Sequence, residues 1–280
     1  MRQRIAKQAG FFSDGLPYNR VGNDKRPLVV FQGLLPNPGP MTGMTEAMIL
    51  RLSRPLVSYY TIYVVNRKPG LAPQTTLTDM AEDYATMIRR EFDGPVDVVG
   101  LSTGGSIAQI FAAEYPELVD RLVIYSSAYR LGDEGRAFQR RIAILCEKRR
   151  WMAVSSESFG FMFLPRRGML HRVTKPLAWL VGLLGTVFVR APADLSDYIV
   201  TIEAEDSFNF QIRLGKIHAP TLVIGGGRDP FYSPALFRET ADGIPNARLA
   251  FDAKASHAPS NASTAQELLT FLDQRRAAVS

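Results

Sequence analysis

The sequence predicts an α/β fold: a doubly wound, mostly parallel sheet with a helical segment inserted into it. Short apolar runs, typical of buried strands, alternate with segments of helical spacing along most of the 280 residues, which is the pattern of such a sheet. The alternation stops between about Tyr129 and Leu214, where no convincing strand appears. We therefore expect a core formed by residues 1–128 and 215–280 and a mostly helical insertion of residues 129–214.

The first elements along the chain are a predicted hairpin and then a series of strands. The stretch FFSDGLPYNRVG places Asp14 and Gly15 at the turn of the hairpin, because Asp-Gly suits tight hairpin turns. Continuous apolar or β-branched runs then predict buried strands. In chain order, these runs are Leu28–Phe31, Tyr59–Val65, Val96–Val99, Leu122–Tyr125, Thr221–Ile224 and Arg248–Phe251.

Three helices are predicted in the core. The first begins near Leu77, carries acidic residues early and Arg89 and Arg90 late, and ends before Gly94, an arrangement that complements the helix dipole. The others span Thr103–Tyr115 and Thr264–Arg276. Each of the first two precedes a strand, as the alternation requires.

Composition and motifs exclude several classes of function. The chain is 46% hydrophobic and 21% charged with a net charge of +6, which is ordinary for a globular protein. No nucleic-acid-binding motif accompanies the basic charge, so we expect no nucleic-acid partner. The sequence also lacks a P-loop, a G-x-G-x-x-G after a strand and a paired set of Cys or His ligands, so we expect no cofactor and no metal.

Three further features predict a cytoplasmic protein. Cys146 is the single cysteine, so no intrachain disulfide can form and a reducing compartment is favoured. The basic N-terminus lacks the apolar core of a signal peptide. The longest apolar run, Leu177–Val189, is shorter than the roughly 20 residues that span a bilayer.

The motif GLSTG contains a candidate nucleophile. Ser102 directly follows a predicted strand and precedes a predicted helix, with Gly100 and Gly104 two residues away on either side. In an open parallel sheet, ligands bind beyond the carboxyl ends of the strands, and G-x-S-x-G at such a turn is a nucleophile signature. The alternative is a helix-capping serine between glycines that occur there by chance.

A serine hydroxyl needs a base, and the sequence contains three histidines. His257 follows the strand Arg248–Phe251 and therefore lies at the carboxyl ends of the strands, which makes it the candidate base. His218 precedes a strand and lies at the opposite end, where a structural role is expected. His171 lies among arginines of the insertion, and a solvated basic surface is expected there.

The base needs an orienting acid, and two aspartates compete for that role. Asp229 directly follows the strand-like stretch TLVIGGG, whose glycines allow the loop to turn across the sheet. Asp252 ends the next strand, five residues before His257, and is the rival, although it could bind the local backbone instead. The order Ser, Asp, His along the chain favours Asp229.

Together, GLSTG around Ser102, GGGRD ending at Asp229 and SHA around His257 resemble the α/β-hydrolase superfamily. The resemblance implies the α/β-hydrolase fold, with residues 129–214 as a cap that covers the site and selects the substrate. It also implies an oxyanion hole formed by the backbone N–H groups of Leu34 and Thr103. The family usually has His-Gly where this chain has Gln32-Gly33, which leaves the role of Gln32 open.

The expected cap is basic as well as apolar. Residues 133–190 contain 11 Arg or Lys residues and 4 Asp or Glu residues, next to aromatic side chains and the apolar run noted above. One interpretation is that the cap contacts an anionic lipid surface. The alternative is a cap helix packed on the core with its arginines in solvent. Both interpretations are compatible with an apolar substrate pocket.

The predicted function is hydrolysis of a small hydrophobic carboxylic ester. Ser102 attacks, His257 takes its proton, Asp229 orients the imidazole and an acyl-enzyme forms. Hydrolysis of a lactone, hydrolysis of a carbon–carbon bond and perhydrolysis are alternatives that use the same triad. A non-catalytic ligand receptor on this fold is an alternative from another class, because a fold does not fix a function.

Overall fold

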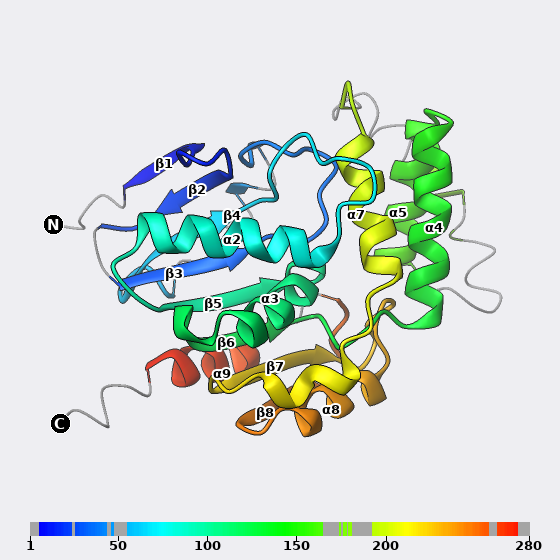
Figure 1. Cartoon of the computed structure of the whole chain (residues 1–280). Helices are drawn as coiled ribbons and strands as arrows, with labels where there is room; N and C mark the ends of the chain where they lie inside the picture. The colour runs from blue at the N-terminus through cyan, green and yellow to red at the C-terminus, as the bar shows by residue number, and fades with distance from the viewer. Residues whose placement is uncertain are drawn as a thin grey trace, which may run out of the picture.

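The structure is a computed structural model, and the fold is drawn in Figure 1. The residues that it describes are 6–23, 26–43, 46–47, 55–164, 174, 176–177, 179–180, 192–257 and 262–273. Several residues of the expected basic cap surface lie outside this set, namely Arg166, Arg167, His171, Arg172, Lys175 and Arg190. Most of the apolar run Leu177–Val189 also lies outside it, so the interpretation of a lipid-contacting cap stays a prediction.

The predicted doubly wound, mostly parallel sheet is confirmed. The strand order in the sheet is β1-β2-β4-β3-β5-β6-β7-β8. Strand β2 runs antiparallel to both of its neighbours, and the remaining pairs are parallel. The strands are β1 (Lys7–Phe11), β2 (Pro17–Val21), β3 (Arg26–Phe31), β4 (Tyr60–Val65), β5 (Val96–Leu101), β6 (Val119–Tyr125), β7 (Thr221–Gly226) and β8 (Ala247–Asp252).

The predicted hairpin is β1 and β2, and its turn contains Asp14 and Gly15. The N–H of Phe12 donates to the carbonyl of Leu16 at 2.9 Å, and the N–H of Gly15 donates to the carbonyl of Phe12 at 2.9 Å. Gly15 has a φ of +92°, a backbone conformation that glycine adopts without steric cost. The Asp-Gly pair is therefore explained by the turn.

Helices cover both faces of the sheet. Alternate residues of β3 point to opposite sides: Val29 and Phe31 pack with α2, α3 and α8, whereas Leu28 and Val30 pack with α9. Figure 1 shows α2 and α3 in front of the sheet and α9 behind it. These four helices are α2 (Leu77–Glu91), α3 (Thr103–Glu114), α8 (Pro234–Gly243) and α9 (Ala262–Asp273). The two 3-10 helices among the described elements are η1 (Pro116–Leu118) and η2 (Gln211–Lys216).

The helices of the insertion lie at the carboxyl ends of the parallel strands (Figure 1). They are α4 (Asp133–Glu147), α5 (Trp151–Phe163) and α7 (Ser196–Asp206), and we refer to these three as the cap helices. They share an apolar cluster that includes Ile142, Val154 and Ile202. Leu34, on the loop after β3, packs against the same cluster. The cap helices therefore pack directly on the loop that carries a predicted oxyanion donor, while the domain boundaries at 128/129 and 214/215 stay predictions.

No helix in the described part of the chain is both long enough and apolar enough to cross a membrane.

Candidate active site

Ser102 lies at a strained turn between β5 and α3. Its φ is +51° and its ψ is −122°, a backbone conformation that costs a non-glycine residue roughly 1–3 kcal/mol and persists only where the surroundings enforce it. Its N–H donates to the carbonyl of Tyr125 on β6 at 2.9 Å. A Cβ at Gly104 would overlap the Phe31 carbonyl oxygen, and a Cβ at Gly100 would lie 2.5 Å from the Cα of Gly105. The turn therefore requires small residues at both flanking positions.

The side chain of Ser102 points to His257 and not to the helix that it precedes. Ser102 occupies the N-cap position of α3, but its side chain forms no capping hydrogen bond. Its Oγ lies 3.0 Å from Nε2 of His257. The geometry thus disagrees with the alternative of a helix-capping serine.

His257 bridges Ser102 and Asp229. Its Nδ1 lies 2.8 Å from Oδ2 of Asp229. The other carboxylate oxygen, Oδ1, accepts the N–H groups of Phe231 at 2.8 Å and Tyr232 at 3.2 Å. The Asp229 side chain is fully buried and the His257 side chain is 11% exposed. The structure therefore brings together the three residues that the sequence predicted as nucleophile, base and acid.

The rival acid Asp252 is engaged elsewhere. Its Oδ1 accepts the N–H of Lys254 at 2.8 Å, and its backbone carbonyl accepts the N–H groups of Gly227 and Ala255. These contacts match the local backbone role that was the alternative for this residue. His218 precedes β7, at the amino ends of the strands, where its carbonyl accepts from Asn246 at 3.2 Å.

The predicted oxyanion donor Leu34 lies on a loop that Arg67 holds. Arg67 donates to the carbonyl of Gly33 at 3.1 Å and to the carbonyl of Leu35 at 3.3 Å. The Gly33 carbonyl and the Leu34 N–H belong to one planar trans peptide and point in opposite directions. Anchoring the carbonyl on Arg67 therefore fixes the direction of the Leu34 N–H. Gly33 itself packs against Ser102, because a Cβ at Gly33 would lie 3.4 Å from the Ser102 Cβ.

The second predicted donor, the N–H of Thr103, is fixed in a similar way. The Thr103 N–H belongs to the same peptide group as the Ser102 carbonyl. That carbonyl accepts the N–H of Gly105 at 2.7 Å and the N–H of Ser106 at 3.3 Å. Thr103 begins α3, so its own N–H has no acceptor within the helix. Free N–H groups at a helix start carry a partial positive charge that stabilises anions.

Gln32, which replaces the usual histidine, is buried. Its N–H donates to the carbonyl of Val65 at 3.0 Å, and its Oε1 has no hydrogen-bond partner among the described residues. The backbone of Gln32 therefore ties the loop to β4, while its side chain has no assigned role.

A cluster of three aromatic rings reaches His257 through Phe231. The Phe231 ring lies 4.6 Å from the imidazole between centroids. Phe161 on α5 and Phe138 on α4 contact Phe231 at centroid distances of 5.0 Å and 5.8 Å, and they stack on each other at 4.0 Å. All three rings are only partly buried, so an apolar surface adjoins the candidate base.

A buried polar group next to Ser102, the Glu205 carboxylate, was not predicted from the sequence. Glu205 on α7 has no exposed surface, and its carboxylate accepts hydrogen bonds from Thr103, Ser106 and Gln139. Burial raises the pKa of the Glu205 carboxyl, and these hydrogen bonds together with the charge of Arg67 oppose that rise. Glu205 follows Thr201 by four residues on the buried face of α7, but the apolar residues of this helix do not form a clear stripe, so the sequence does not mark that face.

Within the described ranges, no group of three or more His, Cys, Asp or Glu side chains is placed to hold a metal ion.

Comparisons with known proteins agree with the fold. A model of the alpha/beta hydrolase family matches residues 42–269. A pimeloyl-[acyl-carrier protein] methyl ester esterase from Chromobacterium violaceum is 27% identical over 223 residues, which cover 78% of this chain and 84% of that protein. A protein of the same description from Neisseria meningitidis serogroup B is 28% identical over 192 residues, which cover 68% of this chain and 72% of that protein.

Solved structures share the fold at lower identity. The enol-lactonase from Burkholderia xenovorans LB400 superimposes with a TM-score of 0.72 at 19% identity, covering 95% of this chain and 99% of that one. A hydrolase from Pseudomonas aeruginosa PA01 superimposes with a TM-score of 0.69 at 18% identity, covering 98% of this chain and 100% of that one.

Proposed function

Because this chain belongs to the alpha/beta hydrolase family, we propose that it is a serine hydrolase that cleaves carboxylic esters of hydrophobic substrates. One observation carries the proposal: Ser102 Oγ, the His257 ring and the Asp229 carboxylate form a continuous chain with contacts of 3.0 Å and 2.8 Å. A hydroxyl, an imidazole and a buried carboxylate in this order make up a nucleophile, its base and the group that orients the base.

The proposed reaction has two steps that share these groups. Ser102 Oγ attacks the ester carbonyl carbon while His257 Nε2 takes its proton, and the same proton passes to the departing alcohol as the carbon–oxygen bond breaks. Water then attacks the acyl-enzyme, giving a proton to His257, and the acid leaves as Ser102 regains its proton. The N–H groups of Leu34 and Thr103 stabilise the negative oxygen in both steps, which is where catalysis of this kind gains most.

Two features support an ester with an apolar acyl or alcohol part. The Phe231 ring lies against His257, and the rings of Phe138 and Phe161 pack on Phe231. Leu34 and Phe138 both pack against the apolar cluster of the cap helices. The curated relatives are described as methyl ester esterases, which supports the ester class over the other bonds that such a triad can break.

The proposal is tested by the hydrolysis of p-nitrophenyl esters from acetyl to palmitoyl. We expect wild-type activity with an optimum at one chain length, and a loss of about 10³-fold or more in Ser102→Ala, as triad removals cause. Ser13→Ala is the matched control, because Ser13 Oγ donates to Glu91 at 3.0 Å in an exposed contact. A folded wild type that cleaves none of these esters, and that a fluorophosphonate does not label at Ser102, would overturn the proposal.

A further inference from the structure

Glu205 is a buried carboxylate whose hydrogen bonds all come from donors next to the candidate nucleophile or from the cap. Its Oε2 accepts Thr103 Oγ1–H at 2.7 Å and a Gln139 Nε2–H at 3.0 Å. Its Oε1 accepts Ser106 Oγ–H at 2.9 Å. An ionised carboxylate only accepts hydrogen bonds, so this donor set fits its charged form.

Two of these donors belong to the first turn of α3. Thr103 immediately follows Ser102, and Ser106 lies one turn later with its N–H on the Ser102 carbonyl. Glu205 thus holds the Thr103 side chain, next to the peptide of the proposed oxyanion donor, and the Ser106 side chain, whose residue donates its N–H to the carbonyl of that peptide. The positive φ of Ser102 is unfavourable by itself, so the contacts around it must enforce it. The two hydroxyl-to-carboxylate bonds act directly on that turn.

The carboxylate comes from the insertion and not from the core. Glu205 lies near the end of α7, and Gln139, its third donor, lies on α4. Figure 1 shows both helices beside the carboxyl ends of the strands. Burying a carboxylate is costly unless it is hydrogen-bonded, and the cap helices already have an apolar cluster that packs them together. Attachment of the cap alone therefore does not require a charged group at this position.

We propose that Glu205 is a positioning residue, which holds the first turn of α3 so that Ser102 keeps its strained conformation and the Thr103 N–H points at the oxyanion. The proposal rests on the proposed function, because it assigns the residue to the same site. Glu205 touches no reacting atom, and it acts through Thr103 and Ser106. It also links the cap helices to the oxyanion hole, so the cap contributes to the rate as well as to substrate choice.

The test compares Glu205→Gln with Asp97→Asn. Both residues have no exposed surface, and both changes replace a carboxylate by an amide of the same shape. Asp97 lies at the start of β5, at the other end of the strand that leads to Ser102. The measurements are kcat and KM on the p-nitrophenyl ester that the wild type cleaves fastest, and the inhibition constant of a trifluoromethyl ketone, which forms a tetrahedral adduct with serine.

A positioning role predicts a specific pattern. In Glu205→Gln the N–H₂ group replaces one carboxylate oxygen, so a hydroxyl that donated there must turn to accept a weaker bond without charge. We expect kcat to fall by about 10- to 100-fold, the range for partial loss of an oxyanion donor. KM should stay within about threefold, and affinity for the ketone should fall in parallel with kcat. Asp97→Asn should keep kcat and ketone affinity within about threefold of wild type.

A second pair of variants keeps the test decisive if Glu205→Gln does not fold. Thr103→Val removes the hydroxyl that binds Glu205 but keeps the backbone N–H and the branched shape. We expect it to lower kcat by about tenfold, and Thr103→Ser, which restores a hydroxyl, to recover most of that loss. Wild-type kcat and ketone affinity in Thr103→Val, or in a folded Glu205→Gln, would overturn the proposal.

Labelling by a fluorophosphonate separates this inference from the function on which it rests. If wild type is labelled at Ser102 while Glu205→Gln reacts and turns over at the wild-type rate, the inference alone is wrong. If wild type is neither labelled nor active, the proposed function is wrong and the inference falls with it.

Discussion

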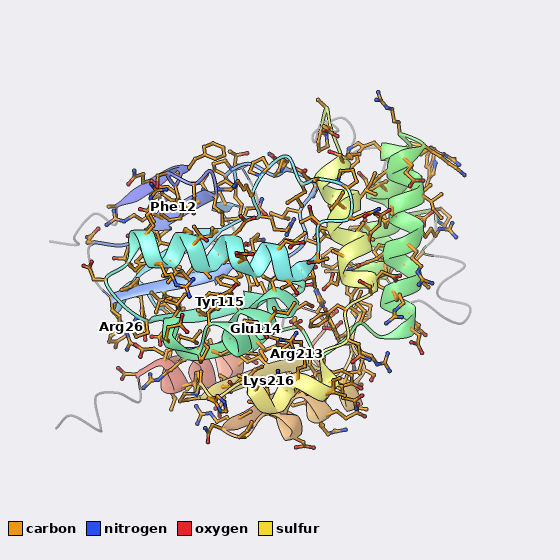
Figure 2. All side chains as sticks on the ribbon, in the orientation of Figure 1. Phe12, Arg26, Glu114, Tyr115, Arg213 and Lys216 are labelled. Atoms are coloured by element: carbon orange, nitrogen blue, oxygen red, sulfur yellow. The ribbon has the colours of Figure 1, made fainter. Side chains whose placement is uncertain are left out.

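Asp97 and Glu205 are both fully buried carboxylates, and they lie toward opposite ends of β5. At the amino end, Asp97 pairs with Arg26 at 2.9 Å and accepts from the Tyr60 hydroxyl at 2.9 Å. At the carboxyl end, Glu205 accepts hydroxyl and amide donors beside Ser102. Figure 2 labels Arg26 on the side of the molecule away from the cap helices.

The difference lies in what each carboxylate holds in place. The Tyr60 hydroxyl also contacts the Leu272 carbonyl, at 2.8 Å, and Arg121 donates to the same carbonyl. The network around Asp97 therefore fastens α9 to the sheet, whereas the network around Glu205 fastens the turn that carries the candidate nucleophile. Two equally buried carboxylates thus have different roles. Asp97 helps to attach α9 to the sheet and, in our proposal, Glu205 aligns the turn at Ser102. We therefore predict that substitutions at the carboxyl end of β5 lower kcat and that substitutions at its amino end lower the free energy of unfolding.

The largest expected effect is at Asp229, at the carboxyl end. In Asp229→Asn, the amide oxygen keeps the bonds from Phe231 and Tyr232, and the N–H₂ group then faces His257 Nδ1. The imidazole would adopt the wrong tautomer, and we expect kcat to fall by about 10³- to 10⁴-fold. Steady-state kinetics on the best p-nitrophenyl ester measures this loss.

Asp252→Asn is the matched control for that change. Its carboxylate binds the Lys254 N–H at 2.8 Å, and we expect kcat within about threefold of wild type, since the amide oxygen of an asparagine can accept the same N–H. Equal losses in the two variants would contradict the assignment of Asp229 as the orienting acid.

Arg67→Lys should give the next largest effect. Burial lowers the pKa of the Arg67 guanidinium, which holds the carbonyls on either side of Leu34. A lysine ammonium lacks the planar fork that reaches both carbonyls, so the Leu34 N–H should lose its fixed direction. We expect kcat to fall by about 10- to 100-fold, as for a weakened oxyanion donor.

The control for Arg67→Lys is the same change at Arg89, whose side chain is half exposed and pairs with Glu117. Exposed ion pairs contribute about 0–1 kcal/mol, so Arg89→Lys should change neither kcat nor the melting temperature measurably. A wild-type kcat in Arg67→Lys would show that the loop keeps its conformation without the guanidinium fork.

Asp97→Ala should separate stability from rate at the amino end. Tyr60 and Arg26 lose an acceptor but keep their contacts to Leu272 and Asp120. We therefore expect the free energy of unfolding to fall by about 1–3 kcal/mol, the cost of leaving buried polar groups without a partner. Urea denaturation measures this loss, and kcat of the folded protein should not change. A fall in kcat with an unchanged free energy of unfolding would contradict the structural role of Asp97.

The sequence allowed the prediction of the local features of the site but not of its buried supports. Ser102, Asp229 and His257 each directly follow a strand or lie in the loop after one, so chain order and strand position were sufficient to select them. The ends of the strands were less clear. Strand β6 begins at Val119 rather than at the predicted Leu122, because Asp120 and Arg121 interrupt its apolar run. The closing helix begins at Ala262, before the predicted Thr264, and its described part ends at Asp273.

Glu205 and Arg67 could not be predicted because their partners are distant in sequence. Glu205 lies 102 residues from Thr103 and 66 from Gln139, and Arg67 lies 34 residues from Gly33. A charged residue in a short window is most often solvent-exposed, so local reasoning places both on the surface. Only the three-dimensional placement of α7 against α4 and beside the start of α3 gives the Glu205 carboxylate its donors.

The pH dependence of stability provides the smallest and most specific test of the comparison. Burial raises the pKa of the Asp97 carboxyl, and Arg26, Tyr60 and Arg121 oppose the rise. A carboxyl with a higher pKa in the folded state binds more protons there than in the unfolded chain. Its contribution to stability therefore falls as the pH rises from the unfolded pKa, about 3.9, through the folded pKa. The variant Asp97→Asn lacks this group. The free energy of unfolding of the wild type, minus that of the variant, should therefore decrease over that pH range and level off above it. Urea denaturation of both proteins between about pH 4 and pH 8 measures the difference. A difference that increases with pH would mean that Arg26 outweighs burial and lowers the pKa of Asp97, which would make the amino-end network an ion pair that stabilises the fold by its charge.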